Sequence, residues 1–308
     1  MPDEIERARR VAALLGPAAQ LDHPFGALTT YRVGGTAAVF ATLSSERDVE
    51  AARSAVGETG IEVLVLGKGS NLVVADAGFG GLVVQLAGDF ATIEIDADSR
   101  SATAGGAVAY PVLARRTASA GLTGLEWAVG VPGSVGGAVR MNAGGHGSET
   151  AEVLVTATIA DVRTGEDEVR VVPVGELGLG YRRSAVRDDQ VVLAARFTLG
   201  QAPAPDCEAA VSEVVVWRRA NQPGGQNAGS VFTNPEGDSA GRIVDQAGLK
   251  GFRLGSAQVS PKHANFIQAD PAGSADDVMR LIAEVQRIVQ ERTGIVLQPE
   301  VHLIGVSL

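Results

Sequence analysis

Residues 121–147 read GLTGLEWAVGVPGSVGGAVRMNAGGHG, with nine glycines in 27 positions. Glycine is found where the backbone needs a positive φ or where another group must approach it closely. Across the chain 39 of 308 residues are glycine, about 13%, against roughly 7% in average proteins. Because proline is not enriched and the apolar patterning is that of a globular protein, this cluster indicates a loop that wraps around a ligand.

A second glycine-rich loop, residues 67–72 (GKGSNL), follows an apolar stretch that reads as a strand. Backbone N–H groups in such a turn form a concave site for anions, and Ser70 and Asn71 add side-chain donors. The loop is not a dinucleotide fingerprint, since the third glycine and a following helix are missing, and it lacks the Lys-Ser/Thr ending of a P-loop. Singly, each loop could be a tight turn or a packing corner of small residues. Together they favour a dinucleotide bound without a Rossmann fold.

The pattern between residues 30 and 200 is mixed and rich in strands. A first helix is expected from Asp3 to the Gly16-Pro17 stop, with two further helices over 47–56 and 112–120. Thr164-Gly165-Glu166, between two β-branched runs, is typical of a hairpin turn. The expected strands are 38–43, 62–66, 82–86, 92–96, 153–161, 169–172 and 191–198.

The C-terminal third differs in composition. Residues 201–205 (QAPAP) are the best candidate for a linker, and a helix over 206–220 follows. A short helix opened by Asp238 or Ser239, a long helix capped by Ser274 and a final strand over 295–304 complete the pattern. We therefore expect an α+β protein with an N-terminal helix over residues 1–20, one domain over 21–200 and a second over 201–308.

Composition excludes several classes of function. With 26 Lys+Arg against 36 Asp+Glu the net charge is −10, which offers no basic surface to nucleic acid or anionic lipid. The longest uncharged run, 220–235, is mostly polar and too short to span a membrane, and the charged N-terminus lacks a signal-peptide core. Cys207 is the only cysteine and the four histidines are scattered, so no metal site is expected. We expect a cytoplasmic protein.

Eight short motifs, in their order and spacing, resemble one family. They are TYRVGG (30–35), LGKGSNL (66–72), PGSVGG with MNAG (132–144), GYRRS (180–184), AGSVFTNP (228–235), GLKG (248–251), VSPKHANF (259–266) and LQPEV (297–301). The family is that of the UDP-N-acetylenolpyruvoylglucosamine reductases, flavoenzymes that make UDP-N-acetylmuramate for bacterial cell walls. Single motifs are weak signals, but eight in sequence are specific, and they cover about residues 21 to 308.

The resemblance implies an FAD-binding domain of the vanillyl-alcohol-oxidase (PCMH) type, made of two α+β subdomains, and a C-terminal substrate domain. FAD would be held non-covalently, reduced by NADPH, and reoxidised by an enolpyruvyl ether of a UDP-sugar in the same site, with ping-pong kinetics. The partner is then a small molecule; the oligomeric state stays open, and a monomer is compatible with the sequence. The implied cofactor contacts are Tyr31, Arg32, Gly67, Lys68, Gly69, Ser70, Asn71, Leu72, Pro132, Gly133, Ser134, Gly136, Gly137, Asn142, Ala143 and Gly144.

The resemblance also assigns three catalytic residues. Hydride addition from flavin N5 to the terminal enolpyruvyl carbon leaves negative charge on the adjacent carbon and its carboxylate, which the permanent cation of Arg182 would stabilise by about 3–4 kcal/mol. Glu300 would contact the same enolate-like group, so it should be protonated or bridged to a cation. Ser230 would donate the proton. Without the resemblance, Arg182 could belong to an exposed charged loop and Ser230 to a turn or cap.

Substrate contacts are implied for Tyr181, Asn234, Lys262, His263 and Asn265. Of these, Lys262 and His263 could stabilise either a seryl alkoxide or the diphosphate. The chain departs from the family pattern at Thr233, where lysine is usual, and this removes a positive charge near Ser230. No extra insertion lies between the expected hairpin and residue 180, which favours the shorter, type II form.

Two other functions stay open. A flavin oxidase or dehydrogenase of the same FAD fold would act on alcohols or hydroxy acids; such enzymes often attach flavin through His or Cys, and only His146 lies close to a glycine loop. Reduction of the flavin by NADPH separates this alternative from the reductase. A non-catalytic binding module for nucleotide sugars would not need Arg182, Ser230 and Glu300 to act together, so substituting them would leave its affinity unchanged.

Overall fold

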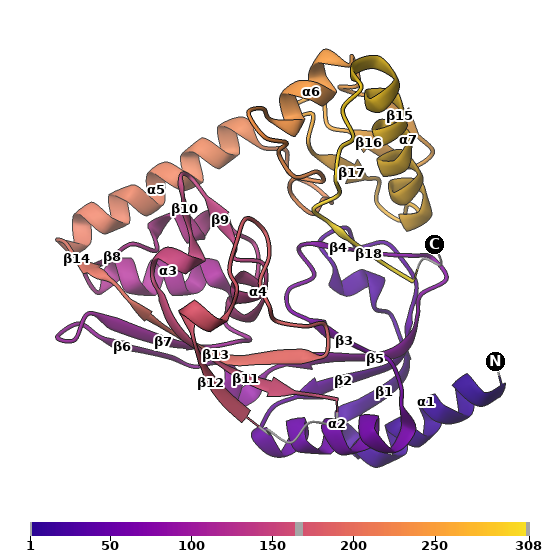
Figure 1. The fold of residues 1–308 in the computed structure, drawn as a ribbon, viewed down its shortest axis with the longest axis vertical. Coiled ribbons are helices and arrows are strands. Elements are labelled where there is room, and N and C mark those ends of the chain that lie inside the picture. Colours follow the sequence, from indigo (N-terminus) through magenta and orange to yellow (C-terminus); the bar gives the residue numbers. More distant parts are fainter. Residues whose placement is uncertain (1, 164–168, 306–308) are drawn as a thin grey trace. The chain divides into compact units, whose positions relative to one another are not determined.

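The chain forms two compact units. The computed structural model describes residues 2–163 and 169–305 (Figure 1). Unit 1 contains residues 2–21, 39–68 and 81–218, and unit 2 contains residues 22–38, 69–80 and 219–305. Two short segments of the N-terminal half are therefore built into the C-terminal unit. The two units are defined by which residues contact one another. The domain limits expected at residues 20 and 200 stay a prediction.

The expected helices are present, with small shifts at their ends. Ser239 and Ser274 cap their helices as predicted, each accepting a hydrogen bond from the backbone N–H three residues on. The first helix begins at Pro2, one residue before the expected cap Asp3. The helix bounds are α1 (Pro2–Leu15), α2 (Glu46–Thr59), α3 (Tyr110–Ser119), α4 (Val135–Arg140), α5 (Ala204–Asn221), α6 (Ala240–Gln246) and α7 (Ala275–Thr293). Within the described ranges, none of them is long and apolar enough to cross a membrane.

The expected linker over 201–205 is wrong, because α5 begins at Ala204 and takes up its second half. Pro205 is tolerated there since the first turn of a helix needs no N–H donor.

The seven strands expected up to residue 201 are all present, together with further strands that were not expected. Their bounds are β1 (Ala19–His23), β2 (Ala37–Leu43), β3 (Val63–Leu66), β4 (Leu72–Val74), β5 (Phe79–Leu86), β6 (Ile93–Asp96), β7 (Ser101–Gly105), β8 (Leu122–Thr123), β9 (Gly144–Gly145), β10 (Ser148–Glu149), β11 (Leu154–Asp161), β12 (Val169–Pro173), β13 (Gln190–Thr198), β14 (Gly200–Gln201), β15 (Arg253–Leu254), β16 (Ala257–Val259), β17 (Ile267–Ala269) and β18 (His302–Ile304). The expected turn at Thr164-Gly165-Glu166 lies outside the described residues, although β11 and β12 on either side pair antiparallel.

The final strand and the unexpected strand β7 each have a clear physical reason. The final strand expected over 295–304 is only β18, because Pro299 has no N–H to continue a ladder. The strand β7 was not expected, since its sequence SATAG lacks large β-branched residues. Small residues are required there: a Cβ on Gly105 would lie 2.0 Å from the carbonyl oxygen of Phe90.

Unit 1 is built on sheets that carry helices. A five-stranded antiparallel sheet has the order β12-β11-β13-β7-β6, and α4 packs against β13. Most residues of a second sheet, β1-β2-β5-β3, also belong to this unit, and its strands β3 and β5 run parallel. The core includes Tyr110, whose ring meets the edge of Trp127 at 5.8 Å between centroids. These elements fix both the turn after β3 and the start of α4.

Unit 2 has one core made from three parts of the chain. Helix α7 packs on the small antiparallel sheet β15-β16-β17 (Figure 1). The core beneath it contains Tyr31 and Val33 from the first segment and Val73 from the second, together with apolar residues of α6 and α7. Strand β4 of the second segment pairs in parallel with β18. The C-terminal residues therefore share their core with two segments that lie far away in the sequence.

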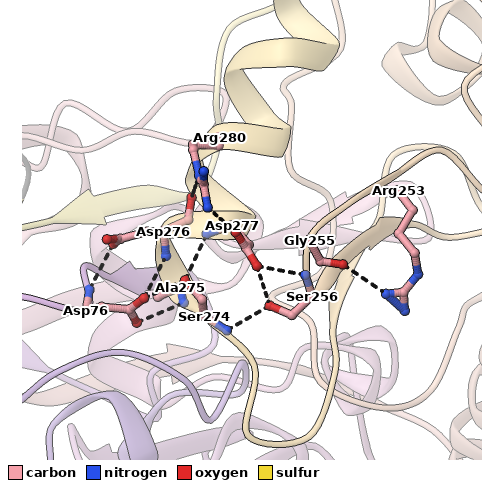
Figure 2. Close-up of polar contacts among 9 residues, drawn as sticks. All are labelled: Asp76, Arg253, Gly255, Ser256, Ser274, Ala275, Asp276, Asp277 and Arg280. Carbon is pink, nitrogen blue, oxygen red and sulfur yellow. Dashed lines mark hydrogen bonds and ion pairs between the residues drawn. The ribbon is translucent and has the colours of Figure 1, made fainter.

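The start of α7 is held by the second of these segments. The carboxylate of Asp76 accepts hydrogen bonds from the hydroxyl of Ser274 and from the backbone N–H of Ala275, the latter at 2.9 Å (Figure 2). In return, the backbone N–H of Asp76 donates to the carboxylate of Asp276 at 3.0 Å. The first N–H groups of a helix lack partners within the helix, so Asp76 satisfies donors that α7 leaves open.

Candidate active site

The two glycine-rich loops meet in unit 1. A cleft is lined by the turn after β3 and by the start of α4. The structure brings together here five residues predicted to bind the cofactor, namely Gly67, Lys68, Ser134, Gly136 and Gly137. The cleft also includes Arg140, which was not predicted.

Gly67 allows the two loops to come this close. A Cβ at this position would lie 2.6 Å from the hydroxyl oxygen of Ser134. Ser134 is buried and caps α4 by accepting a hydrogen bond from the N–H of Gly137 at 3.2 Å. The amide of Gln85 donates to the carbonyl of Gly67 at 2.8 Å and holds the turn from the other strand. Glycine at these positions leaves the backbone without side chains, so that a ligand can approach it closely.

Sequence reasoning missed Gln85 and Arg140. Gln85 is the one amide in an otherwise apolar strand, and such an isolated polar residue could have been read as a partner for a neighbouring loop. Arg140 ends α4, donates to the carbonyl of Val186 at 2.7 Å and pairs with Asp188.

The predicted loop 67–72 is divided between the two units. Gly67 and Lys68 belong to unit 1, whereas residues 69–80 belong to unit 2. There, the side-chain amide of Asn71 donates to the backbone carbonyl of Glu300 at 3.1 Å. The backbone carbonyl of Asn71 accepts from the N–H of His302 at 3.0 Å. Leu72 begins β4 and is paired with His302. Asn71 therefore holds the backbone of a predicted catalytic residue, a role that the sequence did not reveal.

Tyr31 is a core residue of unit 2. Its side chain is fully buried in the cluster shared with α6 and α7, and burial raises the pKa of its hydroxyl. Arg32, beside it, is exposed and has a φ of +55°. Their assignment as cofactor contacts stays a prediction.

The segment 142–144 supports the turn that carries Arg182. Asn142 is fully buried with a φ of +39°. Its side-chain oxygen accepts from the N–H of Ala151 at 2.9 Å, and its amide nitrogen donates to the carbonyl of Gly180 at 3.1 Å. Ala143 likewise pairs through its backbone with Ala138. Asn142 was predicted to contact the cofactor, and in this structure its amide joins two backbone segments of unit 1.

Arg182 lies at the tip of a tight turn. Gly180 and Arg183 close the turn through two backbone hydrogen bonds of 3.1 Å, and Arg182 takes a φ of +55°. Its guanidinium lies 5.0 Å from the ring centre of the exposed Tyr181 and donates to the carbonyl of Gly144 at 3.0 Å. The cation is thus given a fixed place by a ring face and a backbone carbonyl.

Ser230 and Glu300 lie on neighbouring segments of unit 2. The N–H of Glu300 donates to the carbonyl of Val231 at 2.7 Å, and the N–H of Thr233 donates to the carbonyl of Gln298 at 2.9 Å. Two residues that are 70 positions apart in sequence are thereby fixed on adjacent backbones. Arg182 belongs to the other unit.

Apart from Tyr181, which belongs to unit 1, the predicted substrate residues occupy different surroundings in unit 2. Lys262 is exposed, with its ammonium donating to the carbonyl of Arg219 at 2.6 Å. The side-chain oxygen of Asn234 accepts from the N–H of Ala240 at 3.0 Å, at the start of α6.

His263 lies against the ring of Phe266, with the two ring centres 4.8 Å apart. Burial, reinforced by the charge of Lys250, lowers the pKa of His263. Its Nδ1 accepts from the N–H of Asn265 at 3.3 Å, so the proton of the neutral ring is on Nε2.

Two family models match the chain. Residues 37–171 match the FAD binding domain, and residues 221–304 match the C-terminal domain of UDP-N-acetylenolpyruvoylglucosamine reductase.

Similar proteins cover nearly the whole chain. The chain is 43% identical to the UDP-N-acetylenolpyruvoylglucosamine reductase of Rubrobacter xylanophilus, over 94% of this chain and 97% of that protein. It is 41% identical to the reductase of Syntrophotalea carbinolica, over 97% and 98% of the two chains. The crystal structure of the reductase from Thermus caldophilus matches with a TM-score of 0.78 and 35% identity, over 93% of this chain and 98% of that one. The expected α+β fold of the vanillyl-alcohol-oxidase type is thereby confirmed.

Proposed function

Because this chain belongs to the family of UDP-N-acetylenolpyruvoylglucosamine reductases, we propose that it reduces UDP-N-acetylglucosamine enolpyruvate to UDP-N-acetylmuramate with NADPH as reductant. The chain is an FAD-dependent oxidoreductase of peptidoglycan precursor synthesis. Its substrate is then a small molecule, a UDP-sugar ether, and the proposed place of action is the cytoplasm.

The glycine-lined cleft of unit 1 is our candidate for the dinucleotide site. Its glycines put no side chains into the cleft, and a side chain at Gly67 would collide with Ser134. We assign the diphosphate of FAD to the part of the cleft that residues 67–68 and 134–137 line, where Lys68 would add positive charge. Bound FAD would supply the hydride that the reaction needs and would accept it from NADPH. Both partners would use one site in turn, which predicts ping-pong kinetics.

Arg182 would stabilise the negative charge that develops on the substrate carboxylate. Arginine carries its charge at any relevant pH, and its planar fork matches a carboxylate. The contacts with Tyr181 and Gly144 support this role because they hold the guanidinium in place before substrate arrives. Charge placed in advance is worth about 3–4 kcal/mol of barrier in comparable sites.

Ser230 would donate the proton that completes the reduction, and Glu300 would contact the same carbon and carboxylate. The observation that carries this part is the pairing of their backbones through Val231, which sets both side chains on adjacent segments. General acid catalysis contributes about 10²–10⁴-fold in rate. Thr233 leaves this neighbourhood without the lysine that is usual in the family.

Product analysis tests the proposal. Purified protein loaded with FAD is given NADPH and UDP-N-acetylglucosamine enolpyruvate, and the sugar nucleotide is followed by mass spectrometry. We expect a product heavier by two hydrogen atoms and one NADPH consumed per product. A sugar nucleotide of unchanged mass, with flavin instead reduced by an alcohol or hydroxy acid, would favour the oxidase. Binding of the sugar nucleotide without any reduction would favour a binding module.

A further inference from the structure

The side chain of Asn265 is buried, and both of its polar atoms bond to the backbone of Phe232. It is 3% exposed. Its Oδ1 accepts from the N–H of Phe232 at 3.0 Å, and its Nδ2 donates to the carbonyl of Phe232 at 2.8 Å. Its backbone carbonyl accepts from the N–H of Val231 at 2.8 Å. Asn265 therefore pairs with residues 231–232 as an adjacent strand would.

These contacts reach both predicted catalytic residues of unit 2. Val231 follows Ser230 directly, and its carbonyl accepts from the N–H of Glu300. The segment after Ser230 is thus held from one side by Asn265 and from the other by the backbone around Glu300. Phe232 also bridges to Pro299, which continues the same pairing.

Ser230 has no comparable anchor of its own. Among the residues that the structure describes, its hydroxyl makes no side-chain hydrogen bond, and it is neither fully buried nor fully exposed. Only the χ1 torsion lies between the backbone of a serine and its Oγ, so the backbone limits Oγ to three staggered positions. That backbone is the one that Asn265 holds.

We propose that Asn265 is a positioning residue for Ser230 rather than a substrate ligand, an inference that rests on the proposed function. A carboxamide presents an acceptor and a donor in one plane, which matches the N–H and C=O of a single residue. An aspartate of the same shape has only acceptors when ionised, so it would lose the donor to Phe232 and face its carbonyl with negative charge. A misplacement of about 1 Å at a reacting group can cost about 10²-fold in rate.

The test compares Asn265→Asp with Ser256→Ala, a control in the same unit. The hydroxyl of Ser256 donates to Asp277 and accepts from the N–H of Ser274, each at 2.8 Å, so its removal also deletes two hydrogen bonds (Figure 2). Rapid mixing with FAD-loaded protein separates two steps. One is reduction of the flavin by NADPH, and the other is its reoxidation by UDP-N-acetylglucosamine enolpyruvate.

For Asn265→Asp we expect reoxidation to slow by about 10–10²-fold with a larger solvent deuterium isotope effect, because proton donation becomes limiting. Reduction by NADPH should stay within about twofold of wild type, and Ser256→Ala should leave both steps unchanged at equal loss of thermal stability. If Asn265→Asp does not fold, Asn265→Gln replaces it in the test, because it keeps both hydrogen-bonding groups on a longer side chain. For Asn265→Gln we expect a smaller loss in the rate of reoxidation, again with reduction by NADPH nearly unchanged.

Two results would overturn the inference alone: reoxidation of the Asn265 variants at the wild-type rate, or an equal loss in both steps that Ser256→Ala shares. A wild-type protein that NADPH reduces but that the sugar nucleotide does not reoxidise would instead overturn the proposed function, and this inference with it.

Discussion

Arg182 occupies a backbone conformation that arginine rarely takes. A φ of +55° costs a residue with a Cβ roughly 1–2 kcal/mol, and glycine would avoid this cost. Such conformations persist where the surroundings enforce them, and they gather at functional sites. Here hydrogen bonds among Gly180, Arg183 and Asn142 enforce the turn. The turn thereby places the guanidinium against the ring of Tyr181 and the carbonyl of Gly144.

Arg182→Gln should lower kcat by about 10²–10³-fold while leaving the fold intact, because it removes the permanent charge that stabilises the enolate. The kcat of Arg182→Lys, which keeps the charge without the planar fork, should lie between those of wild type and Arg182→Gln. Steady-state kinetics with NADPH and the sugar nucleotide measure the effect. Arg183→Gln is the matched control, since Arg183 is the exposed neighbour in the same turn. Equal losses for both arginines would contradict the assignment.

Gly67→Ala should weaken FAD binding by about tenfold or more. The added Cβ would lie 2.6 Å from the Ser134 hydroxyl, so Ser134 must turn away and α4 loses its cap, at a cost of about 1 kcal/mol. The side chain would also take up space in the cleft that we assign to the diphosphate. Titration of the apoprotein with FAD, followed by flavin fluorescence, gives the dissociation constant. Gly80→Ala is the control, because a Cβ there meets nothing within 4 Å. An unchanged affinity would remove this turn from the cofactor site.

At the scale of elements, the start of α7 depends on carboxylates. Asp277 accepts hydrogen bonds from the backbone N–H and the hydroxyl of Ser256, at 2.7 and 2.8 Å, and forms an ion pair with Arg280 (Figure 2). The Ser256 N–H, then its hydroxyl, and more weakly Arg280 hold the pKa of Asp277 below its usual value. The pKa in the unfolded chain is about 3.9, so the ionised carboxylate stabilises the fold above that pH.

Asp277→Asn should therefore be less stable than wild type near neutral pH, with a difference that shrinks in acid. As the pH falls from about 5 through the folded pKa of Asp277, the wild-type carboxylate is protonated and loses its advantage over the amide. Urea unfolding at a series of pH values measures both proteins. A difference in midpoint that stays constant down to about pH 3 would show that the charge of Asp277 does not contribute.

At the scale of the whole molecule, unit 2 is assembled from three separated segments. Tyr31, Val33 and Val73 belong to its core, and β18 pairs with β4 from the second segment. A fragment containing only the C-terminal residues would expose this core and leave β18 without its partner. We infer that unit 2 cannot be cut out of the chain at a single point.

A fragment of residues 219–308 should consequently fail to fold on its own. Losing several large buried side chains costs about 2–5 kcal/mol each, which is comparable to the total stability of a small domain. Circular dichroism during urea titration is the measurement, with the full chain as reference. A cooperative unfolding transition in the fragment would contradict the importance of segments 22–38 and 69–80.

Seven strands and the helices α1, α2 and α3 were predicted from the sequence, and five of the residues predicted to bind the cofactor line one cleft, because strand periodicity and the glycine motifs are local signals. It predicted neither the sharing of segments 22–38 and 69–80 with unit 2 nor the roles of Asn71, Asn142 and Asn265. Each of these amides bonds to backbone groups distant in sequence, from 9 to 229 positions away, and no local pattern encodes such partners. The predicted length of the final strand was wrong because irregular pairing around Pro299 replaces a regular ladder.

The most direct test of the central claim is the visible spectrum of the FAD-loaded protein under anaerobic conditions. We expect NADPH to bleach the flavin absorption and UDP-N-acetylglucosamine enolpyruvate, added next, to restore it. In Ser230→Ala the first step should proceed and the second should slow by about 10²–10⁴-fold, since the proton donor is missing. A flavin that NADPH bleaches and that the sugar nucleotide leaves bleached would contradict the account.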